Sequence, residues 1–597
     1  MNASFGRILG PLAVVLGVLP ASGCSIPLED QAPMVLNRCG SASDCGPDAT
    51  CADDGRGATT CVATAGDLTG LLVEVRPATA TSGTGEVQAG AGYLLRPEDV
   101  GTRVAGTELG GVISWDANLP PLVDIVDGRV RAYAKDDACA AAAGASMPAD
   151  VFFTRFTPEA GLPSAEYHTT TTIAGPDDHT FAISLPAGRY DVYVQPQLPP
   201  VCTTEEPPPC CALPLPPPYF IRDLAIDPGN TKLNIPLPEQ IKLSGQVSTG
   251  LDISDWTIAL VDRRAGKLIS TEPILLHDPL LKIAQYELYY HPTSGPEPYQ
   301  PPWVRVRAPE PDYSPVILWG LEDVDLDGNS EVDLSIADTL TNPVPVQAQI
   351  LASDERTTVE SNVTLIGTFP GAPNVLFERT LQTLPDGSFS TQLFPASQTE
   401  PAHYKCFARP ANDDTIEAIG VSGDWEIRAD EECFCGHTVL LPERTVVSAQ
   451  VSTQSGQPLD APVAATQSAD AADLVAPRPV NSEIVAGSLS LRLDPGTFDV
   501  TVKPTSESGF PWLVTSQLQI PADQATTALG SLEVPFPVVL RGRVLDAMGA
   551  PVPHASITGW LPVVDPEDES SSVVQIGETV SDADGSFVLL LPPKLTH

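Results

Sequence analysis

Residues 181–196 read FAISLPAGRYDVYVQP, and residues 489–504 read LSLRLDPGTFDVTVKP. In both stretches apolar and polar residues alternate on each side of a glycine turn, and the second half begins with an aromatic residue followed by Asp-Val-x-Val. Strict alternation around a tight turn is typical of a β-hairpin with one buried face. Because the pattern recurs, the sequence predicts a β-module that is repeated along the chain.

A second repeated unit is a proline-bearing extended segment that runs into an alternating strand. It occurs as LNIPLPEQIKLSGQV at 233–247, VLLPERTVVSAQV at 439–451 and LEVPFPVVLRGRV at 532–544, with a weaker copy at 344–349. These openings recur at intervals of about a hundred residues, the size of one β-sandwich. We therefore predict an all-β protein built from tandem Ig-like or prealbumin-like sandwich modules.

The clearest copy of the module lies at the end of the chain. Residues 540–557 read LRGRVLDAMGAPVPHASI, and residues 579–587 read TVSDADGSF. This combination closely resembles the carboxypeptidase regulatory-like domain, a transthyretin-like sandwich, and PDGSF at 385–389 repeats its second half. The resemblance implies an architecture only, since such domains accompany proteases and surface proteins without carrying the chemistry.

The final module is predicted to be incomplete. Residues 587–597 align with 181–191, but Lys594 stands where the turn glycine belongs, and the sequence stops where the aromatic strand should begin. A sandwich without its closing strand exposes a sheet edge. We weigh two explanations, a shortened reading of a longer protein, which we prefer, and a terminus completed by a partner's strand; the sequence does not decide whether residue 597 is the natural C-terminus.

The first residues have the features of an export signal. Arg7 is followed by an apolar run at 8–19 and then by Pro-Ala-Ser-Gly-Cys24. The run is too short to span a bilayer, and such segments are removed on secretion. The Ala-Ser-Gly-Cys24 segment resembles the bacterial lipobox, which implies that Cys24 is lipidated and anchors the protein to a membrane. The alternative is ordinary cleavage that leaves Cys24 for a disulfide.

The resemblance to lipoproteins implies a location in the cell envelope. Ser25 follows the lipidated cysteine, and under the enterobacterial sorting pattern an aspartate there would favour the inner membrane. We therefore expect an outer-membrane lipoprotein, on the periplasmic or the surface face.

Twelve cysteines in an exported chain indicate disulfides. The tightest group, in a stretch rich in Gly, Asp and Ala, is Cys39, Cys45, Cys51 and Cys61. Four cysteines allow three pairings, and the sequence does not choose among them. A zinc site is the rival interpretation, although there is no Cys-x-x-Cys pair. Two further groups are interpreted as local staples: Cys202, Cys210 and Cys211, and Cys406, Cys433 and Cys435.

These signals divide the chain into eight predicted parts. They are a signal peptide at 1–23, a lipidated Cys-rich segment at 24–66, a partial β module at 67–120, sandwiches at 121–236, 237–340, 341–445 and 446–536, and the incomplete module at 537–597. The formal net charge of −44 gives no basic footprint for nucleic acid. It favours solubility, or diffuse binding of cations at the cell surface.

One segment has the shape of a calcium loop. Residues 323–331 read DVDLDGNSE, in which the candidate ligands are Asp323, Asp325, Asp327 and Asn329. Leu334 stands where such a loop needs a bidentate glutamate, and the equivalent junction at 224–235 keeps the turn without the acids. We prefer an inter-module turn to a weak Ca²⁺ site, and we predict no other cofactor.

Aromatic and basic residues gather in one predicted module. The candidate ligand-binding residues are Tyr286, Tyr289, Trp303, Arg305 and Arg307. Alternation in Trp-Val-Arg-Val-Arg would place Trp303 and both arginines on one outward face, suited to sugar rings or a protein partner. The preferred alternative is that Trp303 caps the sandwich and the arginines pair with local acids.

Motifs of common enzyme classes are absent from the sequence. There is no His-Glu-x-x-His, Gly-x-Ser-x-Gly or Gly-Lys-Ser/Thr segment. We predict no catalytic residues and a non-catalytic envelope lipoprotein that acts as a surface stalk or protein-binding scaffold. The first alternative is a polysaccharide-binding or adhesive module, and the second is an accessory subunit of an exported hydrolase. Neither the ligand nor the partner can be named from the sequence.

Overall fold

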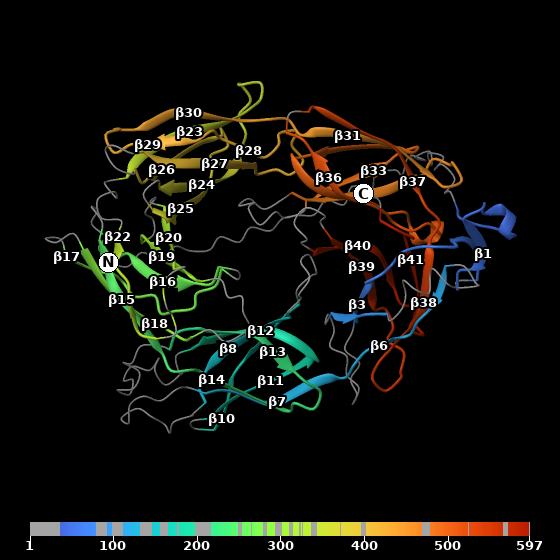
Figure 1. The fold of residues 1–597 in the computed structure, drawn as a ribbon, viewed down its shortest axis with the longest axis horizontal. Helices are drawn as coiled ribbons and strands as arrows, with labels where there is room; N and C mark the ends of the chain where they lie inside the picture. The colour runs from blue at the N-terminus through green and yellow to red at the C-terminus, as the bar shows by residue number, and fades with distance from the viewer. Residues whose placement is uncertain are drawn as a thin grey trace, which may run out of the picture.

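The computed structural model of the chain is built almost entirely of β-strands, so the predicted all-β class is confirmed. The structure describes residues 36–55, 57–78, 92–97, 111–131, 146–155, 165–175, 178–197, 216–248, 253–263, 266–278, 283–292, 301–309, 315–321, 324, 326, 328–335, 343–369, 372–395, 401–467, 478–522, 524–564 and 571–595. Within these ranges the helical segments are two 3-10 turns, Ala42–Asp44 and Ser506–Ser508. Apart from one two-stranded sheet near the start of the described residues, the strands form five two-sheet sandwiches arranged in a ring (Figure 1).

Four of the sandwiches are continuous in sequence. The first contains β7 (Leu122–Arg131), β8 (Ala149–Arg155), β9 (Glu166–Thr170), β10 (Thr172–Gly175), β11 (Asp178–Pro186), β12 (Gly188–Pro196), β13 (Tyr219–Ile226) and β14 (Lys232–Pro236). The second contains β15 (Ile241–Ser248), β16 (Thr257–Val261), β17 (Leu276–Asp278), β18 (Ile283–Tyr290), β19 (Trp303–Arg307), β20 (Val316–Gly320), β21 (Ser330–Glu331) and β22 (Leu334–Ser335).

The next two sandwiches follow in the same order. The third contains β23 (Val344–Ala352), β24 (Ser361–Phe369), β25 (Ala372–Gln382), β26 (Ser388–Leu393), β27 (Ala402–Pro410), β28 (Gly420–Val421), β29 (Trp425–Ile427) and β30 (Phe434–Leu441). The fourth contains β31 (Thr445–Thr453), β32 (Ala461–Gln467), β33 (Val480–Ile484), β34 (Ser488–Leu493), β35 (Gly496–Val502), β36 (Leu513–Ile520) and β37 (Thr526–Val534).

The sandwiches share one topology. The first strand of each pairs antiparallel with one neighbour and parallel with the last strand, as β31 does with β34 and β37. The same parallel pairing joins β7 to β14, β15 to β21 and β22, and β23 to β30. Each of the three full proline-bearing openings therefore holds the end of one sandwich's last strand and the first strand of the next sandwich, and that first strand lies inside its own sheet.

The glycine-turn motif is not a hairpin. β34 pairs with β31 in one sheet, whereas β35 pairs with β32 and β36 in the other, and β11 and β12 are separated in the same way. Each strand does bury alternate residues, with Leu489, Leu491 and Leu493 at most 2% exposed. The predicted hairpin is wrong because the alternation shows only that each strand buries one face. Two strands in facing sheets meet that condition as well as two strands paired in one sheet.

The fifth sandwich joins the two ends of the described chain. It contains β3 (Leu72–Arg76), β4 (Tyr93–Leu95), β5 (Val112–Ser114), β6 (Ala117–Asn118), β38 (Val538–Leu545), β39 (Ser556–Val564), β40 (Ser571–Val580) and β41 (Ser586–Leu591). β3 pairs with β39 as β35 pairs with β32, and β5 and β6 run parallel to β38 as β37 does to β31.

This pairing corrects two predictions. Residues 67–120 are not a separate partial module, and the module at 537–597 does not lack its closing strand. β3 occupies the place of the missing strand, and its Val73 and Val75 are fully buried in the common core. The alternating Leu-Val-Glu-Val-Arg of β3 satisfies the open edge of β39 with backbone hydrogen bonds, although the two strands are almost 500 residues apart in the sequence.

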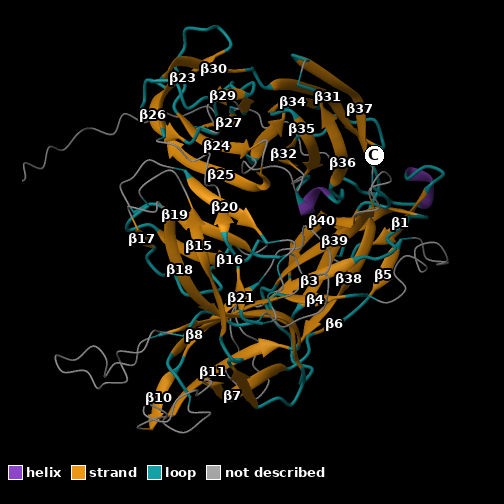
Figure 2. Cartoon of the chain, turned by 60° about the vertical axis from the view of Figure 1, so that its left-hand side comes forward, coloured by secondary structure: helices purple, strands orange, loops and turns teal. Residues whose placement is uncertain are grey.

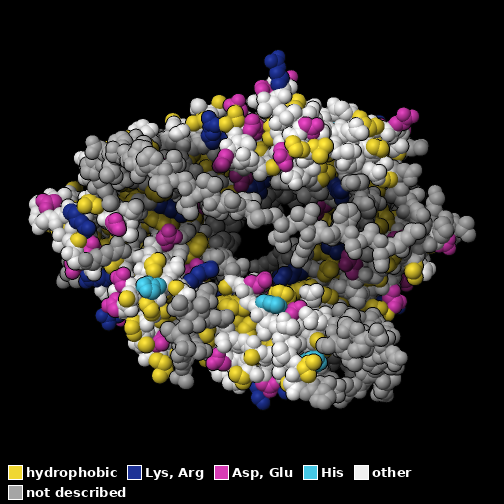
Figure 3. All heavy atoms as spheres, turned by 180° about the vertical axis from the view of Figure 1, so that it is seen from behind, with side chains coloured by type: hydrophobic (Ala, Val, Ile, Leu, Met, Phe, Trp, Pro, Cys, Tyr) yellow, Lys and Arg dark blue, Asp and Glu magenta, His cyan; other side chains and the backbone are white. Residues whose placement is uncertain are grey.

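The ring has an inner and an outer wall. In Figure 1 the sheet that contains the first strand of each sandwich faces outward, and the second sheet faces the centre. β20 pairs with β25, so the second and third sandwiches share one eight-stranded sheet. Figure 2 shows the same order of sandwiches from another direction, and the space-filling view in Figure 3 keeps an opening near the centre. An extended stalk is therefore contradicted, because the last sandwich is completed by the first strands.

Candidate functional site: the joints of the ring

The N-terminal cysteines form two disulfides. Cys39 pairs with Cys51 and Cys45 with Cys61, around the short hairpin of β1 (Ala49–Asp53) and β2 (Thr59–Ala63). The sulfurs of Cys39, Cys45 and Cys61 lie close enough to hold a metal ion, but as disulfides they offer no thiolate. This arrangement is that of a disulfide knot and not of a zinc site. Cys24 lies outside the described residues.

Of the other two cysteine groups, the one that the structure describes departs from the prediction at one position. Cys433 pairs with Cys435, whereas Cys406 is a free thiol buried on β27, so the staple interpretation is wrong for Cys406. Burial raises the pKa of the Cys406 thiol to about 12, which makes it a poor nucleophile at neutral pH. Cys202, Cys210 and Cys211 lie outside the described residues.

Of the predicted calcium ligands only Asn329 is described. Its Oδ1 accepts a hydrogen bond of 2.8 Å from the backbone N–H of Lys242, across the parallel pairing of β15 and β21. Nearby, the Gln246 N–H donates to Asp333, and in the fifth sandwich the Arg543 N–H donates to Asp116. Asn329 therefore helps to fasten the last strand to the first. Asp323, Asp325 and Asp327 lie outside the described residues.

The predicted aromatic and basic site is not one surface. Tyr286 lies on β18 in the outer sheet, is 5% exposed, and donates its hydroxyl hydrogen to the Val332 carbonyl. Tyr289 shares that sheet, where its hydroxyl donates to Glu287, whereas Trp303 begins β19 in the inner sheet. The five residues therefore cannot meet one ligand together.

The predicted alternation of Trp-Val-Arg-Val-Arg fits the local geometry of β19. Val304 and Val306 are buried while Trp303, Arg305 and Arg307 point away from the core. The Arg263 guanidinium lies 4.1 Å above the Trp303 ring, and Arg305 forms a 2.8 Å ion pair with Glu272. Arg305 thus pairs with a local acid, as the preferred alternative expects, whereas Trp303 stacks with Arg263 on the face away from the core.

The residues that sequence reasoning missed lie where sandwiches meet. At the joint of the first and second sandwiches, Lys267 lies about 5 Å from the centres of the Phe152 and Tyr193 rings. Arg222 of β13 reaches 2.6 Å from Asp262, whose side chain is 1% exposed. A buried charge pair of this kind holds its two sandwiches in one orientation, because separating them would leave each charge unpaired.

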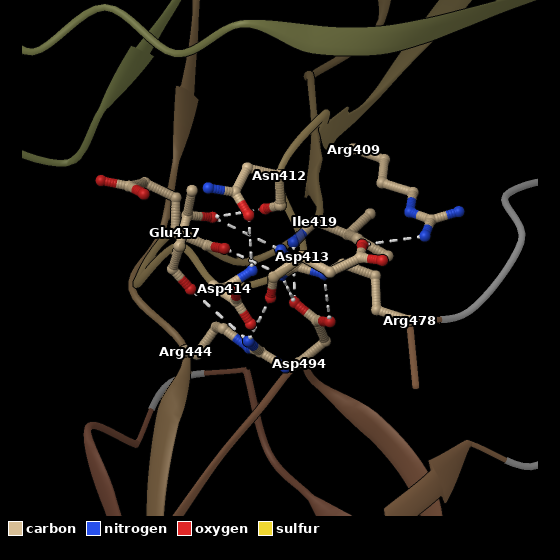
Figure 4. A network of polar contacts seen from close by, with 10 residues as sticks. Arg409, Asn412, Asp413, Asp414, Glu417, Ile419, Arg444, Arg478 and Asp494 are labelled. Atoms are coloured by element: carbon tan, nitrogen blue, oxygen red, sulfur yellow. Dashed lines mark hydrogen bonds and ion pairs between the residues drawn. The ribbon is translucent and has the colours of Figure 1, made fainter. Parts of the chain in front are cut away.

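The joint of the third and fourth sandwiches is a buried polar network (Figure 4). Arg478 and Asp494 of the fourth sandwich form a bidentate pair at 2.5 and 3.0 Å, and the two side chains are 0% and 3% exposed. The same guanidinium donates to the Glu417 carbonyl of the third sandwich, and Asp494 accepts from the Ile419 N–H. The pair is therefore satisfied by backbone groups of the neighbouring sandwich.

A second arginine completes this joint. Arg444, on the linker between the two sandwiches, donates to the carbonyls of Asp413 and Thr415 at 3.1 and 3.4 Å. Burial, with Arg478 nearby, lowers the pKa of Arg444, although it stays far above neutrality for a guanidinium. The loop that carries Asp413 thus accepts hydrogen bonds from two buried arginines. These bonds fix the orientation of the fourth sandwich relative to the third.

The fifth and first sandwiches meet through a shared apolar core. Tyr93 of β4 and Tyr167 and Tyr190 of the first sandwich belong to one buried cluster, and Arg155 donates to the Gly92 carbonyl across the joint. Burial raises the pKa of Tyr190, whose hydroxyl donates to the Pro186 carbonyl. This contact closes the ring on the side opposite the third sandwich.

Comparison with known proteins gives no family. No family profile matches the chain, and no curated protein matches it. Among the residues that the structure describes, no helix has the length and apolarity needed to cross a membrane.

Three solved structures show weak similarity to parts of the chain. A streptococcal ancillary pilin is 13% identical over 50% of this chain and 99% of its own, with a TM-score of 0.21. The Bacillus anthracis TIE protein is 10% identical over 69% and 74%, with a TM-score of 0.17. The tip fimbrial protein Mfa3 from Porphyromonas gingivalis, with a C-terminal truncation, is 8% identical over 29% and 79%, with a TM-score of 0.13. At these scores the similarity carries no functional argument.

Proposed function

We propose that this chain is a non-catalytic, lipid-anchored envelope protein whose ring is a rigid scaffold for a protein partner. One observation carries the proposal: strands at the two ends of the described chain complete one sandwich, so the modules form a closed body. Buried charge pairs at two of the joints make that body stiff. A stiff ring presents fixed surfaces to a partner, which an extended stalk of freely turning modules does not.

The anchor belongs to the same proposal. The described chain starts at residue 36, beside the joint of the fourth and fifth sandwiches, and the segment from Cys24 to Leu36 can span at most about 40 Å when fully extended. A lipid on Cys24 would therefore hold that edge of the ring near the membrane. The resemblance of residues 540–587 to a carboxypeptidase regulatory-like domain also supports a structural role, because such domains do not carry the catalytic chemistry of the proteins that contain them.

The experiment compares binding by a closed and an opened ring. A Cβ on Gly542 would collide with the Trp115 carbonyl oxygen, so Gly542→Val should prevent β5 and β6 from docking on β38. Gly423→Ala is the matched control, because nothing lies within 4 Å of its added Cβ. Each acylated protein is used as bait in detergent-solubilised envelope membranes, and bound proteins are quantified by mass spectrometry.

Wild-type protein and Gly423→Ala should retain the same envelope protein, and Gly542→Val should lose it. A partner retained equally by Gly542→Val would contradict the ring as the binding unit. Wild-type protein recovered soluble and without acyl mass would contradict the anchor, and Cys24→Ser should then behave like wild-type. Binding to purified envelope polysaccharide alone, or a co-purified hydrolase whose activity depends on the chain, would favour the corresponding alternative.

A further inference from the structure

The disulfide knot at residues 36–63 contacts the fourth sandwich directly. The Asn37 N–H donates to the Ser508 carbonyl at 2.7 Å, and the Asn37 side-chain amide donates to the carbonyls of Gly509 and Cys61 at 2.9 and 2.8 Å. Asn37 is 3% exposed. Cys39, Cys45, Ala49 and Cys61 belong to the same buried cluster as Phe510 and Phe536.

The opposite face of the knot contacts the fifth sandwich. Val62 is fully buried against Val539, Val588 and Leu590. The Ala63 N–H donates to the Pro537 carbonyl at 2.9 Å, and Arg541 donates to the Asp53 carbonyl at 3.2 Å. A single small segment therefore lies between two sandwiches and binds both.

The knot itself contains little secondary structure and depends on its disulfides to stay folded. Its stretch is rich in Gly, Asp and Ala, and its described secondary structure is one 3-10 turn and the β1–β2 hairpin. Two disulfides, closing loops of 12 and 16 residues, constrain it. A segment this small depends on such cross-links because it cannot bury enough apolar surface by itself.

From these contacts we infer that the knot is a redox-sensitive clamp that fixes the fourth sandwich against the fifth and so keeps the ring closed. When its disulfides are reduced, the knot unfolds. The contacts of Asn37 with the fourth sandwich and of Val62 with the fifth are then lost together. The inference concerns the ring alone and does not depend on the membrane anchor or on a partner.

The two bonds differ in access, which sets an order of reduction. Cys45 and Cys61 are 5% and 3% exposed and face the fourth sandwich, whereas Cys51 is only partly buried. A dithiol reductant attacks one sulfur through its thiolate, forms a mixed disulfide, and then closes on itself, releasing two cysteine thiols and a cyclic disulfide. Cys39–Cys51 should be reduced first, and Cys45–Cys61 only after the knot has lifted from the fourth sandwich.

The first test uses cysteine variants of the full chain, since a reductant would reach every disulfide. Cys39→Ser with Cys51→Ser is compared with Cys433→Ser with Cys435→Ser, which removes the described disulfide of the third sandwich. Amide hydrogen exchange should quicken roughly tenfold at residues 506–510 and 538–541 in the first variant, because these segments, which the knot covers, become exposed to solvent when it detaches. It should be unchanged there in the second.

Exchange that quickens only within residues 36–63 would show that the knot is a passive appendage and overturn the inference. Asn37→Ala, which leaves all cysteines intact, keeps the test valid if the cysteine variant misfolds. It should quicken exchange at 506–510 while both disulfides still form. In wild-type protein treated with dithiothreitol, alkylation that reaches Cys45 and Cys61 before Cys39 and Cys51 would contradict the proposed order.

Discussion

Asp499 and Asp191 occupy the same position of the repeated aromatic-Asp-Val-x-Val motif and have the same task. Asp499 accepts a 3.0 Å hydrogen bond from the Gln517 N–H, and Asp191 accepts one from the Asp223 N–H at 3.0 Å. Gln517 and Asp223 have φ angles of 55° and 58°, which are left-handed conformations that residues other than glycine adopt at a cost. In both sandwiches the register of the neighbouring strand shifts at this point, so the aspartate fastens a bulge.

Replacing Asp499 should show that its role is to accept this hydrogen bond. Burial raises the pKa of the Asp499 carboxyl, so the charge itself is unfavourable in the folded chain. Asp499→Ala should lower the free energy of unfolding by about 1–3 kcal/mol, because the partly buried Gln517 N–H loses its acceptor. Asp499→Asn keeps an acceptor oxygen and should cost much less. Urea unfolding of the two variants measures the difference, and equal losses would contradict this role.

His291 makes the joint of the first and second sandwiches sensitive to pH. The side chain is 2% exposed and packs edge-on against Tyr219, with ring centres 5.5 Å apart. Burial lowers the pKa of His291 from its usual 6.5 to about 4, an effect that the Pro238 backbone opposes only in part. The unfolded chain therefore takes up a proton at a higher pH than the folded chain does.

The sign of the effect follows from that difference. Above pH 6.5 the imidazole is neutral in both states; between pH 6.5 and about 4 only the unfolded state is protonated, so stability falls as the pH falls. The loss attributable to His291 should reach about 3 kcal/mol near pH 4 and then level off. In His291→Phe this part of the loss should disappear. The free energy of unfolding of both proteins is measured with urea across that range. An equal fall with pH in the variant and in wild-type protein would contradict the assignment.

At the scale of elements, the sequence allowed the strands to be predicted but not the sheets they join. The alternation in residues 181–196 correctly indicated two half-buried strands, yet β11 and β12 enter opposite sheets. The alternation does not distinguish a hairpin within one sheet from two strands in facing sheets, because each strand buries one face in both arrangements. The distinction lies in the register with β7 and β8, strands that are far away in sequence.

The joint residues were missed for a related reason. Asp494 stands in the turn of the second motif, where the first copy has Pro186, so it looked like an ordinary polar turn residue. Its function depends on Arg478 and on the backbone of the third sandwich, at Ile419. A contact between modules leaves no periodic signal in either module.

The third–fourth joint provides a test at this scale. Asp494→Leu should destabilise the protein by about 3–5 kcal/mol, because Arg478 is left buried and unpaired beside Arg444. Arg478→Met should have a similar cost for the opposite charge. The double variant should be more stable than either single variant, since both charges leave together. Calorimetric melting of the three variants decides this, and additive losses would mean that the two residues act independently.

At the scale of the whole molecule, the closure of the ring could not be predicted because its two halves look complete as separate patterns. β3 resembles any short alternating strand, and β38–β41 resemble a module with a truncated end. Sequence reasoning pairs neighbours first, since most strands pair with elements close in sequence. The fifth sandwich violates that expectation, and its effect is to place the first sandwich beside the last.

The fifth sandwich also gives the sharpest test of the fold as a whole. Residues 537–595 alone should be unstable or self-associating, because β39 and β38 then have open edges in both sheets. Adding residues 67–118 through a flexible linker after residue 595 should give a monomer that melts cooperatively, since β3, β4, β5 and β6 would refill those edges. The matched control is the same fusion carrying Gly542→Val, which blocks β5 and β6 but leaves the other pairings available. Size-exclusion chromatography and thermal melting compare the three proteins. A stable monomer from residues 537–595 alone would show that the N-terminal strands are dispensable to the sandwich, and the strand pairing that closes the ring would then not be needed for folding.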